Sequence, residues 1–177
     1  MPHTLHAVDI GTNIQKSPAF LALNPNGRIP ALVDDDITIF ESGAILIYLA
    51  EKYQRFLPSA GQARAEVMSW LMWQMGGVGP MFGQAYHFKN AKRDDNYGLE
   101  LYRSEALRLL NVLESRVANH DFMAAEYSIA DMATLPWIRI VAGLRSKNET
   151  RTEHQGGSLP GFFPASPKGP GKLGTNP

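Results

Sequence analysis

Short apolar and polar segments alternate through the first third of the chain. Residues 4–10 alternate between apolar and polar side chains, a pattern that predicts a half-buried strand. Residues 29–34 and 37–40 predict two further short strands. The three aspartates at 34–36 lie between them and predict the turn of a hairpin rather than a metal site.

Two helices are predicted in the same region. One covers residues 17–23, where Ser17 is in the capping position and Pro18 in the first helical position. The second begins after Ser42, which we expect to cap it, and carries apolar residues at helical spacing. Residues 1–58 are therefore predicted to form a mixed α/β unit.

The pattern from residue 62 to 142 is helical only. Apolar side chains recur at intervals of three and four in two long stripes. The Gly-rich segment 76–83 lies between the stripes, and it predicts close helix packing or a kink rather than a phosphate loop. Ser128 and Asp131 have the spacing of a capping box at the start of a last helix.

The composition changes after this helical part. Residues 143–177 contain 7 Gly and 5 Pro, and their few apolar side chains show no period. We predict that this segment is a disordered tail.

The charge and the cysteine content exclude several classes of function. The chain has 17 Lys plus Arg and 17 Asp plus Glu, so the basic excess typical of nucleic-acid-binding proteins is missing. It has no cysteine, which excludes disulfides, thiolate metal sites and a cysteine nucleophile. Any thiol chemistry would need a thiol carried by a ligand. No apolar segment has the length of a membrane span or the form of a signal peptide, so we predict a cytoplasmic protein without membrane contact.

Four motifs, in this order, resemble glutathione transferases over residues 4–142. FLALNPNGRIPAL at 20–32 resembles the segment that presents the family's cis-proline, and FESGAILIYLA at 40–50 resembles its glutathione-binding turn and helix. WLMWQMGGVGPMFGQ at 70–84 is similar to the bacterial nu-class branch, whose relatives are the fungal Ure2-like proteins. YSIAD at 127–131 resembles the family's capping box.

This resemblance implies a thioredoxin-like glutathione-binding part over 1–58, followed by an all-α glutathione-transferase domain over 62–142. The family has one more strand and one more helix before the segment that aligns with residue 4, and further helices after Ala142. The resemblance therefore implies that the chain is N-terminally truncated and has an atypical C-terminus. A truncated gene model or a frameshift near residue 143 is our hypothesis for both ends.

The resemblance also implies a glutathione site. Ser42 would bind a glutathione carboxylate at a helix N-terminus, and Glu41 would face the ammonium group. A cis Pro30 would turn the backbone of Ile29 outward to pair with the cysteinyl residue. Further polar contacts are implied by position: Gln15 and Arg28 at the glycyl end, and Arg108 from the helical half.

The implied function is glutathione-dependent transfer or disulfide-bond reduction by a homodimer. Glutathione is the co-substrate, a small electrophile or disulfide is the second substrate, and no metal is involved. The residue that stabilises the glutathione thiolate lies, in the family, in the segment before residue 4, so no catalytic residue is assigned. The alternative is a module that binds glutathione or dimerises without catalysis.

Overall fold

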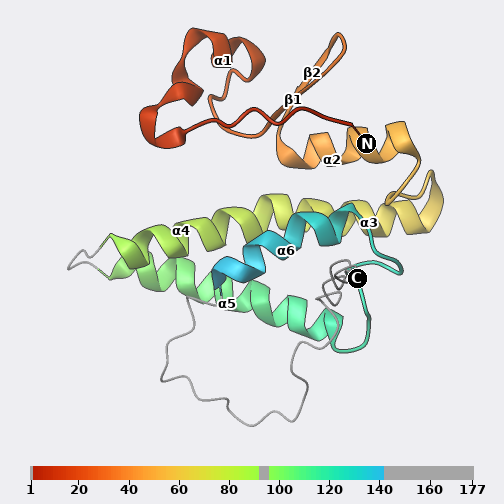
Figure 1. The fold of residues 1–177 in the computed structure, drawn as a ribbon. Helices are drawn as coiled ribbons and strands as arrows, with labels where there is room; N and C mark the ends of the chain where they lie inside the picture. Colours follow the sequence, from red (N-terminus) through yellow and green to blue (C-terminus); the bar gives the residue numbers. More distant parts are fainter. Residues whose placement is uncertain (1, 92–95, 142–177) are drawn as a thin grey trace, which may run out of the picture.

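The computed structural model describes residues 2–91 and 96–141 (Figure 1). The predicted order, an α/β part followed by an all-helical part, is confirmed. The predicted tail at 143–177 lies outside the described residues.

The first part contains one small sheet among its described residues. Two 3₁₀ turns, η1 (Ile10–Thr12) and η2 (Ile14–Lys16), lead into helix α1 (Pro18–Leu23). Strands β1 (Ala31–Asp34) and β2 (Ile37–Phe40) form an antiparallel hairpin in which Ala31 is opposite Phe40. Helix α2 (Ser42–Tyr53) follows directly. The predicted hairpin turn at the three aspartates is confirmed, with Asp35 at a φ of 52°.

The strand predicted at 4–10 is wrong. Residues 2–9 have no regular secondary structure, nearly all of them are exposed, and Ile10 already belongs to η1. An alternating pattern supplies one apolar face, but a strand also needs a neighbour that pairs with its backbone. The sheet of the described residues consists of β1 and β2 only, so this segment has no such neighbour.

One polar cluster fastens the hairpin to α2. The carboxylate of Asp34 in β1 accepts hydrogen bonds from Lys52 and from the Tyr48 hydroxyl, the latter over 2.7 Å. The bond to Lys52 is the main reason that the pKa of Asp34 is lowered, and the bond to Tyr48 is the second.

We expect this cluster to make stability depend on pH at the acid end. Because the pKa of Asp34 is lower in the folded state, its contribution is present above the ordinary aspartate pKa of about 4 and is lost as pH falls through the folded value. Asp34→Asn should therefore be less stable than the wild type near pH 7, and the difference should close below about pH 4. Urea unfolding at several pH values measures this difference in stability. The control is Asp36→Asn, because Asp36 is exposed. A difference that stays constant down to pH 2 would contradict the expectation.

The helical part begins with two helices joined in line by a π turn (Figure 1). Helix α3 (Gly61–Trp73) continues through η3 (Gln74–Val78) into α4 (Gly79–Asn90), and the residues at both junctions have right-handed helical dihedral angles. The Gly-rich segment 76–83 thus does not interrupt the helix: its first residues lie in η3, and Gly79 begins α4. Its glycines permit close packing: a Cβ on Gly79 would lie 3.3 Å from the Trp137 ring.

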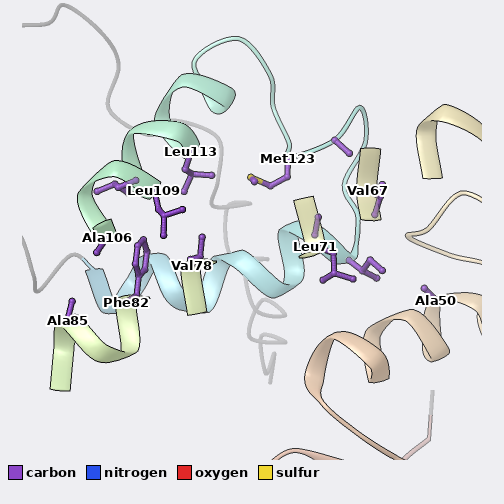
Figure 2. Packing of buried hydrophobic residues seen from close by; sticks show 14 residues of the cluster. Ala50, Val67, Leu71, Val78, Phe82, Ala85, Ala106, Leu109, Leu113 and Met123 are labelled. Carbon is purple, nitrogen blue, oxygen red and sulfur yellow. The ribbon is translucent and has the colours of Figure 1, made fainter. Parts of the chain in front are cut away.

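Two further helices complete the core. Helix α5 (Tyr97–Val117) packs on α4, and α6 (Ile129–Val141) packs on α2, α3 and α4. The buried cluster in Figure 2 lies among these helices, and α5 contributes Ala106, Leu109, Leu110 and Leu113 of its predicted apolar stripe to it. Its largest fully buried apolar members are Phe82, Leu71, Leu109, Met123 and Ile129. Among the helices of residues 2–91 and 96–141, none has both the length and the apolar character that a membrane crossing requires.

The predicted capping box is confirmed at the start of α6. The buried Asp131 carboxylate accepts from the Ser128 backbone N–H over 2.9 Å and from the Ser128 hydroxyl over 3.1 Å. Its second oxygen accepts from the Met123 N–H over 2.8 Å. The Ser128 hydroxyl oxygen in turn accepts from the Ala130 N–H over 3.3 Å. Asp131 thus joins the helix to the loop that precedes it.

Candidate functional site

The first feature of the candidate site is the turn between β2 and α2. Glu41 occupies this turn at φ 69° and ψ 119°, a conformation that residues with a side chain rarely adopt. Such backbone outliers persist where the surrounding structure imposes them, and they gather at functional sites. The Glu41 side chain is exposed, and the N-terminus of a twelve-residue helix follows it.

Ser42 is not the cap that we predicted. The capping position belongs to Glu41, whose side chain makes no capping bond, and Ser42 is the first residue of α2. A capping residue must have non-helical dihedral angles, and the unusual conformation of Glu41 supplies this change of direction one residue earlier. The Ser42 hydroxyl lies instead 3.9 Å from the Met75 sulfur and is exposed. It is therefore available at a positive helix end.

The second feature is the Ile29–Pro30 peptide bond, which is cis. Pro30 immediately precedes β1, and Glu41 immediately follows β2. Because Ala31 is opposite Phe40, Pro30 and Glu41 flank the same end of the hairpin. Ile29 and Pro30 are both exposed there.

The third feature is the loop between α1 and β1. The buried Asn24 side chain holds it, accepting from the Asn26 N–H over 2.9 Å and donating to the Arg28 carbonyl. Gly27 has a φ of 62° and lies against η2, where a Cβ would be 3.1 Å from the Gln15 carbonyl oxygen. The Arg28 side chain is exposed.

Gln15 of η2 lies beside this loop through its backbone carbonyl. Its amide nitrogen donates to the Ile10 carbonyl over 3.3 Å, and its amide oxygen is buried with no hydrogen-bond partner among the described residues. A buried acceptor without a partner is costly, so this oxygen can receive a donor from a ligand or water.

Arg108 stands apart from these residues. It lies on α5 and forms a two-bond ion pair with Glu105 of the same helix, each bond 2.7 Å long. This pair raises the pKa of Arg108 and lowers the pKa of Glu105. The structure thus connects Gln15, Arg28, Ile29, Pro30, Glu41 and Ser42 through one hairpin end and its loop, while Arg108 already has a carboxylate partner.

Two contacts of the site were missed by sequence analysis. The Asn26 side-chain amide donates to Glu41 over 3.4 Å, and Met75 of η3 lies against Ser42 and Gly43. A Cβ on Gly43 would be 3.1 Å from the Met75 sulfur, so the glycine permits this approach. In the sequence, the only signal of this contact with Met75 was the small residue after Ser42. No group of three metal-ligating side chains occurs in the part of the chain that the structure describes.

Comparisons with known proteins agree with these features. Residues 5–51 match the model of the glutathione S-transferase N-terminal domain. The chain is 44% identical over 147 residues to the disulfide-bond oxidoreductase YfcG of Escherichia coli, covering 78% of this chain and 68% of that protein.

Two solved structures extend the likeness beyond the N-terminal domain. A glutathione transferase family member from Pseudomonas fluorescens, with two glutathione bound, has a TM-score of 0.78 and 43% identity; the match covers 81% of this chain and 68% of that one. The glutathione transferase URE2P8 from Phanerochaete chrysosporium, with oxidized glutathione, has a TM-score of 0.73 and 34% identity, with 79% and 67% covered. The α/β part is thioredoxin-like, as predicted. The chain spans about two thirds of the length of each of these relatives, and it belongs to the glutathione S-transferase family.

Proposed function

We propose that this chain binds glutathione at the hairpin end formed by Pro30, Glu41 and Ser42, and that it serves glutathione-dependent disulfide reduction or transfer. The observation that carries the proposal is the Glu41–Ser42 turn, which places an exposed carboxylate and an exposed hydroxyl side by side at the N-terminus of α2. The similarity to a disulfide-bond oxidoreductase and to structures with bound glutathione supports it.

Each proposed contact follows from the chemistry of glutathione. The γ-glutamyl carboxylate accepts from Ser42 at the positive helix end, and the ammonium group pairs with Glu41. The backbone of Ile29, before Pro30, pairs with the cysteinyl residue in the manner of an added strand.

The structure gives less support to the remaining proposed contacts. Arg28 would pair with the glycyl carboxylate, and the unpartnered amide oxygen of Gln15 would accept from the glycyl N–H. Arg108 would have to exchange its bond to Glu105 for the ligand.

The proposed chemistry needs no cysteine of the protein, and the chain has none. The thiolate of one glutathione attacks a disulfide, displaces one sulfur as a thiolate and forms a mixed disulfide. The thiolate of a second glutathione attacks this mixed disulfide, so that the substrate leaves as two thiols and glutathione leaves as its disulfide. Two protons, one from each glutathione thiol, end on the two product thiols.

The proposal also covers the branch of the family, the domains, the oligomeric state and the location in the cell. The motif at 70–84 and the likeness to URE2P8 favour the nu-class and Ure2-like branch. We propose domains at 1–58 and 62–142, and a homodimer of the kind that this family forms. A cytoplasmic location is consistent with the glutathione that buffers the cytosolic thiol pool.

Calorimetric titration of the purified chain with glutathione and with glutathione disulfide tests the proposal. We expect saturable binding at millimolar ligand or below, and reduction of a mixed disulfide by added glutathione. Absence of saturable binding would contradict the proposed site. Binding without turnover of a mixed disulfide or an aryl halide would favour the alternative, a non-catalytic module.

Ser42→Ala gives the sharpest single test of the proposed site. Loss of a hydrogen bond to a charged group costs about 1.5–3 kcal/mol, so glutathione affinity should fall roughly ten- to a hundredfold. Because Ser42 makes no capping bond, thermal stability should stay close to that of the wild type. Titration calorimetry and thermal unfolding measure the two effects separately.

Two variants serve as controls for Ser42→Ala. Ser104→Ala removes an exposed hydroxyl from α5 and should leave glutathione affinity unchanged. Arg28→Ala should have a smaller effect than Ser42→Ala, because the charge of a long exposed side chain is screened by salt. Equal affinity of Ser42→Ala and the wild type would remove Ser42 from the site.

A further inference from the structure

Asn26 lies in the loop between α1 and β1, and its backbone is fixed on both sides. Its N–H donates to the Asn24 side chain over 2.9 Å, and Asn24 is only 2% exposed. Its carbonyl accepts from the Lys16 ammonium over 3.4 Å. These contacts use main-chain atoms of Asn26, so they persist whatever side chain this position carries.

The side chain of Asn26 points at the candidate site. Its amide nitrogen donates to Oε1 of Glu41 over 3.4 Å, a contact between residues fifteen positions apart. The backbone of Glu41 is held at its unusual dihedral angles, but its side chain is exposed and has three rotatable bonds. Within residues 2–91 and 96–141, the bond from Asn26 is the hydrogen bond that the Glu41 carboxylate accepts, and it engages one of its two oxygens.

The chemistry of this donor suits a binding site for a cation. An amide holds a carboxylate without neutralising it, whereas a lysine or arginine would cancel its charge. Glu41 takes part in no salt bridge among the described residues, and the nearby Lys16 ammonium is held on the Asn26 carbonyl instead. A carboxylate already oriented by one oxygen loses less conformational freedom when its other oxygen binds a ligand.

We propose that Asn26 is a positioning residue for Glu41 and thereby sets the affinity for the ammonium group of the ligand. The proposal rests on the proposed function, in which that ammonium belongs to the γ-glutamyl residue of glutathione. Asn26 itself touches no ligand in this scheme. It acts only through Glu41, so its effect on ligand affinity should disappear when Glu41 is removed.

The experiment compares two ligands and two protein backgrounds. The ligands are glutathione and N-glutaryl-cysteinylglycine, which has hydrogen in place of the α-ammonium group and is otherwise the same. Asn26→Ala is measured by titration calorimetry with both ligands, in the wild type and in the Glu41→Ala background. Asn111→Ala removes an exposed asparagine from α5 as matched control, and thermal unfolding confirms that each variant is folded.

We expect Asn26→Ala to lower the affinity for glutathione about two- to tenfold and to leave the affinity for the glutaryl analogue unchanged. In the Glu41→Ala background the same substitution should have no further effect, because a residue that acts through another shows non-additive changes. The Asn111→Ala control should bind both ligands as the wild type does.

Three results would overturn the inference. They are unchanged glutathione affinity in Asn26→Ala, an equal loss for both ligands, or a loss that persists in the Glu41→Ala background. The last two would mean that Asn26 shapes the loop rather than Glu41. All three leave glutathione binding by the wild type intact, whereas a wild type that binds no glutathione would overturn the proposed function itself.

Discussion

Asp131→Ala should reduce the free energy of unfolding by about 3–5 kcal/mol. The Asp131 carboxylate is 1% exposed and accepts three hydrogen bonds, one from the Met123 N–H and two from Ser128. Alanine would leave two buried backbone N–H groups without an acceptor, and each such group costs about 1–3 kcal/mol. Urea unfolding measures the loss as a lower midpoint at unchanged slope.

The matched control for this prediction is Asp121→Ala. Asp121 lies in the same loop and is exposed, so its removal should change the free energy of unfolding by no more than about 0.5 kcal/mol. A cost below about 1 kcal/mol for Asp131→Ala would show that water replaces the carboxylate, and the capping box would then not be what holds the loop onto α6.

The capping box was predictable because it depends on residues three positions apart. The same holds for α1, whose cap Ser17 accepts from the Phe20 N–H, and for the β1–β2 hairpin. The absence of a strand at 4–10 could not be predicted in this way, because strand formation depends on a partner strand that the local pattern does not specify. Ser42 failed as a cap for a related reason: the sequence does not show that Glu41 takes a positive φ and occupies the capping position one residue earlier.

The same distinction between local and long-range contacts applies to the candidate site. Pro30, Glu41 and Ser42 were predicted from contiguous motifs, and the structure brings them to one end of the hairpin. The contacts of Asn26 with Glu41 and of Met75 with Ser42 join residues fifteen and thirty-three positions apart. A pattern of neighbouring residues does not indicate contacts between positions so far apart in the sequence. The Arg108–Glu105 pair, in contrast, is an i, i+3 contact on one helix and could have been expected from the sequence.

Phe82→Ala should reduce the free energy of unfolding by about 3–5 kcal/mol. Phe82 projects from α4, is 1% exposed and belongs to the buried cluster that includes Leu109 and Ala106 of α5 (Figure 2). Removing the ring costs its transfer from water and leaves a cavity, which the helices close only in part because the interior is densely packed. Tyr86, one turn further along α4 and 50% exposed, provides an aromatic control on the same helix: Tyr86→Ala should cost no more than about 1 kcal/mol in urea unfolding. Because the proposed glutathione contacts lie on the hairpin end and the start of α2, Phe82→Ala should keep its glutathione affinity within about twofold wherever the variant is folded. Similar costs for Phe82→Ala and Tyr86→Ala would contradict the arrangement of α4 against α5, since only a correctly oriented helix buries one of these rings and exposes the other.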